Sequence, residues 1–162
     1  MRSWLVMLVA CFLPGFVVAG HPTDASMIAT FQAHEAEFIA LVAMLDADRE
    51  LLTRSATSIG LENFEKVGVP PSRVAAYRQL LSRLGATQLR FFPDYGIVSL
   101  LVSVLGFGPT SSTKSYVYRP NVAGGGTVDD TDSYLPKPGE GYDVIEVERH
   151  IAGNWFIHLD AT

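Results

Sequence analysis

The first half of the chain has the apolar spacing of a helix. Between residues 24 and about 58 an apolar side chain recurs every seven positions, which places these side chains on one helical face. They are Phe31, Phe38, Leu45 and Leu52. The charged run 46–50 puts Asp48 into that face, and the helix can break there. The pattern predicts one long helix or two shorter ones.

A second helix follows, and then the period changes. Pro70, Pro71 and Ser72 are typical of a helix start, and Gly85 of a helix end. Beyond Gly85 the period falls from 3.6 to 2, in segments rich in Val, Ile, Phe and Tyr. The predicted strands are 88–92, 96–105, 114–119, 142–150 and 154–160.

This order of elements predicts an α+β fold. Helices within about 24–84 precede strands within about 87–160, and short turns at 93–96 and 152–153 join neighbouring strands. We expect helices packed on a mainly antiparallel sheet of about five strands. Residues 97–105 are apolar on nearly both faces, which predicts the central strand.

The chain length fits a single domain. It has 162 residues, 48% of them hydrophobic, enough for one core and too few for two. Residues 120–141 carry three consecutive glycines, three prolines and four acidic residues. That composition predicts a long mobile loop between two strands.

Residues 1–20 have the pattern of a secretory signal peptide. One positive charge at Arg2 precedes an apolar run over 4–13, a Pro14-Gly15 break, and small residues at Ala19 and Gly20. We expect cleavage near Ala19 or Gly20, which leaves residues 21–162 as one periplasmic or secreted domain.

Two alternatives to cleavage remain open. One is a single-pass membrane anchor, although the apolar run is short for a span. The other is a lipoprotein, because Leu8-Val9-Ala10-Cys11 has the letters of a lipobox. A diacylated Cys11 would attach the chain to a membrane, the one case in which we expect a membrane partner.

The mature chain would be acidic and free of thiols. Removing residues 1–20 takes away Cys11, the only cysteine, and one of the 12 basic residues, which leaves 11 against 17 acidic residues and a net charge of −6. Nucleic acid is disfavoured as a partner, because its phosphates need a basic face. Thiol catalysis and cysteine metal sites are excluded.

Residues 108–115 nearly match two catalytic patterns. One is a phosphate-binding loop with Thr113 in place of its second glycine, and the other is the S-x-x-K of acyl-enzymes at Ser111 and Lys114. Both patterns need a helix, whereas residues 115–119 alternate like a strand. We expect a polar turn at 110–113, with Lys114 as a solvated charge at a strand edge.

The histidines do not form a predicted metal site. His21 is expected to be a disordered first residue, and His34 a half-buried helix-packing residue, since Phe38 stands where a zinc helix would need histidine. A two-residue turn at 152–153 would put His150 and His158 on opposite faces.

The acidic run 129–132 is expected to be a solvated loop, because it lacks the further ligands of a calcium loop. We predict no cofactor and no metal.

Large side chains on the predicted sheet suggest a binding face. Tyrosine and tryptophan dominate interface hot spots, although half-buried packing is equally open for tyrosines on a strand. The predicted binding residues are Ser112, Lys114, Tyr116, Tyr118 and Trp155.

Three short motifs stand out in the second half of the chain: Tyr77-x-x-Leu80 with Gly85, the segment Ser111-Ser112-Thr113-Lys114-Ser115-Tyr116-Val117-Tyr118, and Gly153-Asn154-Trp155-Phe156. Together they resemble an uncharacterised family of small exported proteobacterial proteins. Members of that family tend to have a glycine where this chain has Ser115. The family has no established function, so the resemblance implies export and a shared fold and nothing about chemistry.

We therefore expect a non-enzymatic exported binding protein of the inhibitor or immunity type. Its acidic charge suits a basic protein partner, such as an envelope-targeting enzyme or toxin. One alternative is a small periplasmic hydrolase that uses Lys114 with Ser111, Ser112 or Ser115. The other is a structural envelope lipoprotein, if Cys11 is acylated.

Overall fold

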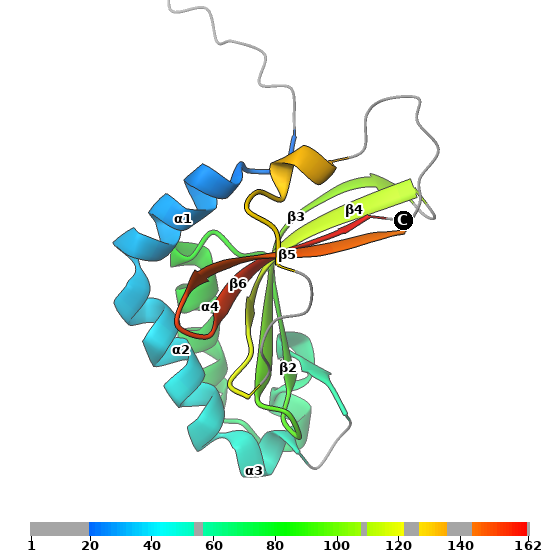
Figure 1. The fold of residues 1–162 in the computed structure, drawn as a ribbon. Coiled ribbons are helices and arrows are strands. Elements are labelled where there is room, and N and C mark those ends of the chain that lie inside the picture. The colour runs from blue at the N-terminus through cyan, green and yellow to red at the C-terminus, as the bar shows by residue number, and fades with distance from the viewer. Residues whose placement is uncertain (1–19, 54–56, 108–109, 122–126, 136–143, 162) are drawn as a thin grey trace, which may run out of the picture.

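The computed structural model describes residues 20–53, 57–107, 110–121, 127–135 and 144–161. The predicted signal peptide therefore lies outside the described residues except for Gly20. Within these ranges, helices lie on one face of a six-stranded antiparallel sheet (Figure 1). The predicted α+β fold is confirmed. The strand beyond the five expected is β1 (Ile59–Gly60), whose two residues pair with β2 (Gln88–Phe92).

Four α helices form in the described part of the chain. They are α1 (Asp24–Ala33), α2 (Glu35–Ala47), α3 (Arg49–Leu52) and α4 (Pro71–Arg83). Three short 3-10 helices accompany them: η1 (Leu61–Asn63), η2 (Glu65–Val67) and η3 (Asp132–Tyr134). The predicted second helix, from the Pro70-Pro71 pair to the Gly85 stop, is confirmed as α4.

The predicted long helix is broken twice. One break falls at Asp48, within the predicted charged run. The other, at His34, was not predicted, and it bends the chain by 76° between α1 and α2. The bend lets the two helices follow the twisted sheet, so that Phe31 and Phe38 both reach the core.

The acidic side chain in the apolar helix face is paired. Tyr77 Oη donates a hydrogen bond to Asp48 Oδ2 at 2.8 Å, and Arg73 Nε donates to the same oxygen at 3.2 Å. Burial, together with the neighbouring Asp48, raises the pKa of Tyr77 far above its usual value. Asp48 therefore joins α4 to the end of α2 without leaving a buried charge unpaired.

The sheet has the order β1-β2-β3-β4-β6-β5, with all neighbouring strands antiparallel. The remaining strands are β3 (Ile97–Phe107), β4 (Thr110–Tyr118), β5 (Ile145–Ala152) and β6 (Trp155–Ala161). The prediction that residues 97–105 form a central strand is confirmed, since β3 and β4 are the two innermost strands.

The predicted polar turn at 110–113 is wrong. These residues belong to β4, where Ser112 pairs with Leu105 on one side and with Ala161 on the other. A strand with a neighbour on each side satisfies all its backbone groups, and this outweighs the turn preference of serine. Lys114 consequently lies in the middle of the sheet and not at an edge.

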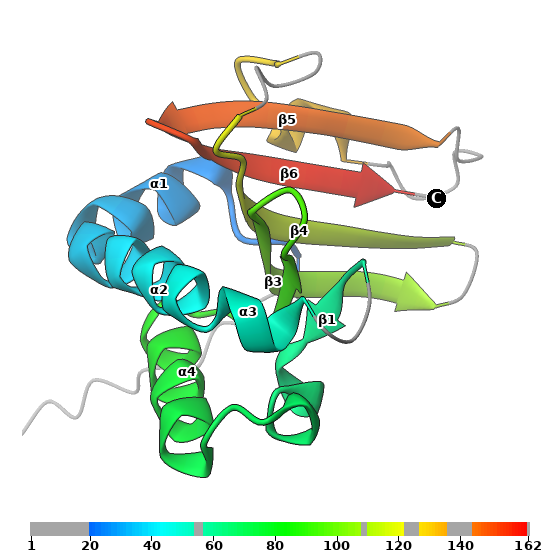
Figure 2. The ribbon, with the colours of Figure 1, turned by 90° about the horizontal axis from the view of Figure 1, so that it is seen from below.

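The helices and the sheet enclose one aromatic-rich core. The ring of Phe38 on α2 packs edge-on against Tyr116 and Trp155, with ring centroids 4.9 Å apart in each pair. Leu41 and Leu45 from the same helix are fully buried. Figure 2 shows α1, α2 and α4 gathered on one side of the strands. The predicted apolar helix face is therefore the face that builds the core.

The helices cover only part of their side of the sheet. Beyond the start of α1, residues 20–23 and η3 lie over the strands instead (Figure 1). Among the described helices no single one is long and apolar enough to cross a membrane; α1 and α2 reach that length only together, across their bend. The partly covered end of the sheet is where the polar interior of the molecule lies.

Candidate functional site

Strand β4 presents two different faces. Alternation along a strand sends Ser112, Lys114 and Tyr116 toward the helices and the N-terminal segment. Thr113 and Ser115 point to the opposite face, where they line a shallow depression. Each face carries a polar cluster, and the two clusters differ in how completely their groups are paired.

Lys114 is a fully buried cation with its own set of acceptors. The side chain is 0% exposed. Its Nζ donates to Asp24 Oδ1 at 2.7 Å, to the carbonyl oxygen of Pro22 at 3.0 Å, and to Asp132 Oδ1. An ammonium group has three N–H donors, so all three are used. The predicted solvated edge charge is therefore wrong, and Lys114 is instead the centre of a buried network.

Asp24, the first residue of α1, accepts hydrogen bonds from three residues. Besides Lys114, these are Thr131, whose backbone N–H bonds to Oδ2 at 2.8 Å, and Arg149, whose Nη1 lies 3.3 Å from the same oxygen. Burial alone would raise the pKa of Asp24, but the hydrogen bonds from Lys114 and Thr131 outweigh it and lower the pKa below its usual value. Asp24 is thus held as a carboxylate inside the protein.

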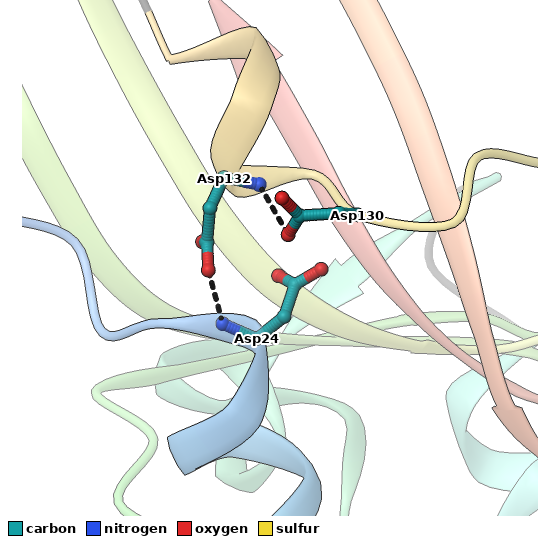
Figure 3. A group of neighbouring side chains, drawn as sticks. All are labelled: Asp24, Asp130 and Asp132. Carbon is teal, nitrogen blue, oxygen red and sulfur yellow. Dashed lines mark hydrogen bonds between the residues drawn. The ribbon is translucent and has the colours of Figure 1, made fainter.

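Two further carboxylates approach Asp24, as Figure 3 shows. Asp132 Oδ2 accepts from the backbone N–H of Asp24 at 2.9 Å, and Asp130 Oδ1 accepts from the N–H of Asp132 at 3.1 Å. Ligand oxygens of the three acids lie within 4.8 Å of one another. The Lys114 ammonium already bridges Asp24 and Asp132. These ion pairs account for the closeness of the three acids, so we do not assign a metal site to them.

The acidic run 129–132 is not the solvated loop that was predicted. Thr131 is completely buried, and its hydroxyl donates to Asp24 Oδ1. The Lys114 ammonium draws Asp132 inward, whereas Asp129 is exposed. A buried cation needs carboxylates nearby, and this requirement overrides the loop composition.

His21 is buried and ordered, contrary to the prediction of a disordered first residue. Its Nδ1 lies 2.6 Å from Ser103 Oγ and its Nε2 lies 2.8 Å from Ser112 Oγ. Burial, followed by the nearby Lys114 charge, lowers the pKa of His21 below its usual value. The ring therefore acts as a neutral link between the N-terminal segment and strands β3 and β4.

The residues predicted to form a binding face lie mostly inside the molecule. Lys114, Tyr116 and Trp155 are at most 5% exposed, and Ser112 is 8% exposed. Tyr116 Oη donates to the carbonyl oxygen of Met27 at 2.8 Å, and burial raises the pKa of Tyr116 to about 12. Tyr118 is half-buried and packs on Trp155, with ring centroids 5.2 Å apart. Tyr116, Tyr118 and Trp155 pack in or against the apolar core, whereas Ser112 and Lys114 lie in the buried polar network, so the five do not form one contact surface.

A surface does form over the buried network, from residues 127–134, which we call the acidic segment. A depression of about 450 Å³ lies on it. It is lined by Thr127, Val128, Asp129, Asp130, Ser133 and Tyr134. The Tyr134 side chain is 43% exposed. The acidic segment therefore combines outward carboxylates with an accessible aromatic ring.

The opposite face of the sheet also differs from its prediction. The loop of the β5–β6 hairpin is Gly153-Asn154, which pairs Ala152 with Trp155, and a bulge before Ala152 sets His150 opposite Phe156. His150 and His158 consequently share a face, where opposite faces were predicted. They remain apart, because His158 lies beside Glu148 while His150 Nε2 donates to the carbonyl oxygen of Gly153 at the turn.

Comparison of the chain with protein-family models, with curated proteins and with solved structures finds no match. The resemblance to an exported family stays a prediction. The arguments about function therefore rest on the geometry of the two clusters.

Sequence reasoning missed the acidic partners of Lys114. Asp24 and Thr131 are 107 residues apart, and nothing in the local pattern around either one indicates the contact. The available signal was the central position of the neighbouring strand 97–105. A lysine one strand away from the middle of a sheet needs a buried counter-charge.

Proposed function

We propose that this protein is an exported binding protein of the inhibitor or immunity type, which holds a basic protein partner against the acidic segment. The observation that carries the proposal is the anchoring of that segment by Lys114. The buried ammonium and Asp24 fix Thr131 and Asp132, while Asp129 and Tyr134 on either side face outward.

Anchoring prepares this surface for binding. Val128 N–H donates to the carbonyl oxygen of Glu148 at 2.7 Å, which ties the start of the acidic segment to β5. Thr131 and Asp132 tie its end to α1 and β4. A segment that is ordered beforehand loses less conformational entropy when a partner binds. The acidic segment thus has the rigidity that an inhibitor surface needs.

The charge and chemistry of the surface favour a basic partner. Asp129 and Asp130 line the depression together with the exposed ring of Tyr134. The predicted mature chain has a net charge of −6, which would attract a basic protein from a distance. An exposed tyrosine next to carboxylates is the kind of group that anchors such an interface.

The alternative of a hydrolase built on Lys114 gains no support from the geometry. A general base or nucleophile needs a free amine that can reach a substrate, whereas the Lys114 ammonium is fully buried and donates to three acceptors. The buried pairing accounts for Lys114 as an anchor.

A capture experiment with paired variants tests the proposal. The purified protein is used as bait in an envelope extract, and a captured partner is identified by mass and titrated by calorimetry. We expect a one-to-one partner whose Kd rises at least about 30-fold when Asp129→Asn and Tyr134→Ala are combined, because an aromatic hot spot contributes about 2 kcal/mol or more.

The matched control is the pair Asp94→Asn and Tyr95→Ala on the β2–β3 turn. It removes the same chemical groups from another exposed site, since Tyr95 is 65% exposed. It should leave the Kd unchanged. Recovery of no stoichiometric partner, or a partner that the acidic-segment variant binds as tightly as the wild type, would count against the proposal.

Export is proposed on the N-terminal pattern and has its own test. Cleavage after Gly20 would keep His21 and Pro22, both of which contact the sheet network. The intact mass of the protein recovered from the envelope should correspond to a chain that starts at Gly20 or His21. A mass that includes an acylated Cys11 would instead favour the lipoprotein alternative.

A further inference from the structure

A row of side chains on the helix-free face of the sheet carries a second polar cluster. Strand register places Ser115 of β4 opposite His158 of β6, and His158 opposite Glu148 of β5. Directly opposite residues in antiparallel strands have Cβ atoms about 4.5–5.5 Å apart on the same face. A serine, a histidine and a glutamate therefore stand side by side across three strands.

The histidine is oriented by the glutamate. His158 Nδ1 lies 3.1 Å from Glu148 Oε1, and a carboxylate oxygen can only accept, so Nδ1 carries the proton. In the neutral ring this leaves Nε2 with the lone pair. A histidine whose Nδ1–H donates to a buried carboxylate has the hydrogen-bond arrangement of a serine hydrolase, in which Nε2 accepts the serine proton.

The buried carboxylate of Glu148 is paired with an arginine. Its side chain is 6% exposed, and Arg119 Nη2 donates to the same Oε1 atom. Arg119 thus balances the charge of the carboxylate. Within the described residues, Glu148 Oε2 and Arg119 Nε are buried without a hydrogen-bond partner. Buried polar groups left unpaired are rare and call for a functional explanation.

The row borders a depression, although Ser115 itself is only 5% exposed and the His158 side chain 17%. Ser115 and His158 line one depression of about 290 Å³, whose floor also includes the apolar side chains of Phe92 and Leu101. Gln88 and Arg90 line it as well. The depression therefore offers a nucleophile beside its base, N–H donors for a developing negative charge, and an apolar wall.

We infer that Ser115, His158 and Glu148 form an acyl-transfer site for small esters with a short acyl chain. Ser115 Oγ forms a bond to the ester carbonyl carbon as its proton passes to His158 Nε2. The C–O bond to the alcohol then breaks, and the alcohol leaves with that proton. Water, deprotonated by the same nitrogen, cleaves the acyl-serine and releases the carboxylic acid.

The inference does not rest on the proposed binding function, since the acidic segment takes no part in the site. It keeps Ser115, one of the three serines considered beside Lys114, but assigns a different base. Lys114 points to the opposite face of β4, whereas His158 stands on the face of the serine. The sequence motif was misleading because residues three apart in a strand face opposite ways, and a cross-strand neighbour is the nearer partner.

Covalent labelling with a fluorophosphonate tests the site directly. Ser115 Oγ would form an O–P bond while the P–F bond breaks, fluoride leaves, and the serine proton passes to His158. We expect one phosphonyl group per molecule, located on Ser115 by peptide mass. His158→Ala should slow the labelling at least about 100-fold, the usual contribution of a general base, and Glu148→Gln should slow it less.

Controls separate chemistry from folding. Ser72→Ala changes an exposed serine of α4, outside the depression, and should label at the wild-type rate. Circular dichroism checks each variant, and His158→Gln replaces His158→Ala if the latter does not fold. Hydrolysis of p-nitrophenyl acetate should fall in parallel with labelling. Absence of label from Ser115 in the wild type, or equal labelling rates in the wild type and the folded His158 variant, would overturn the inference.

Discussion

The two faces of strand β4 hold similar residue types in opposite circumstances. On one face Lys114 is buried, with its three donors matched to Asp24, Asp132 and a backbone carbonyl. On the other face Ser115, which is 5% exposed, lines a depression beside His158. One residue along a strand thus separates a group that holds the fold together from a group that can meet a ligand.

The comparison shows how charge and pairing decide the role of a polar side chain, since Lys114 and Ser115 are both buried. A buried charge without a partner is strongly unfavourable, so a lysine in this position requires its acids. Ser115 is also buried, at 5% exposed, but its hydroxyl is neutral and carries no such requirement. The following predictions test this difference, beginning with the largest effect.

Replacing the buried Lys114 should cause the largest loss of unfolding free energy. Lys114→Met removes the charge that pairs Asp24 with Asp132 and leaves Asp24 buried beside an apolar side chain. Breaking a buried pair on one side costs about 3–5 kcal/mol of unfolding free energy. Urea denaturation at neutral pH measures it. A loss below about 1 kcal/mol would show that the network is not structural.

Removing the charge of Asp24 should lower the unfolding free energy by less than Lys114→Met does. It should also change how the unfolding free energy depends on pH in the acid range. Asp24→Asn keeps an acceptor for Thr131 but loses the charge, for an expected loss of about 2–3 kcal/mol. The pKa of Asp24 is lowered in the folded protein from 3.8, so its stabilisation is present above pH 3.8 and disappears as pH falls through the folded pKa. The unfolding free energies of the wild type and the variant should therefore become similar in acid. Urea denaturation at several pH values measures this.

A smaller effect is expected at the N-terminal segment. His21→Gln should cost about 1 kcal/mol at pH 8, where the neutral ring bonds Ser103 and Ser112. The pKa of His21 is lowered in the folded protein from 6.5, so the unfolded chain takes up the proton first as pH falls below 6.5. The wild type loses that stability in acid and the variant does not. Thermal unfolding between pH 8 and pH 5 should show that the difference in stability between the wild type and the variant narrows as pH falls. A constant difference would contradict the lowered pKa of His21.

The smallest effect is expected on the opposite face of β4. Ser115→Ala removes a hydroxyl that lines a depression and should change the unfolding free energy by less than about 1 kcal/mol. It is the natural comparison for Lys114→Met, since it changes the neighbouring residue of the same strand. A loss as large as that of Lys114→Met would mean that both faces are equally structural.

The elements themselves were largely predictable. Periodicity identified α4, strands β2, β3 and β6, and the central position of β3, because each has a regular apolar pattern over its whole length. The break at His34 was not predictable, since the apolar spacing continues through it and only the twist of the sheet requires a bend.

The polar interior was not predictable from local patterns. Residues 110–113 have turn-like composition, yet they are strand because β3 and β6 pair with them on both sides. Lys114 can be buried because Asp24 and Asp132, which are distant from it in the sequence, pair with its charge. A contact between segments so far apart leaves no periodic signal, whereas the row at Ser115 follows from strand register once the order β4-β6-β5 is known.

Hydrogen exchange on the Asp132→Ala variant tests the central claim most directly. The claim is that the buried Lys114 network anchors the acidic segment without being exposed itself. Lys114 keeps Asp24 and Pro22 in this variant, so the sheet should remain folded. We predict that the amides of Val128 and Thr131 exchange at least about tenfold faster than in the wild type while those of β2 and β3 keep their protection. Unchanged protection at Val128 and Thr131 would contradict the account.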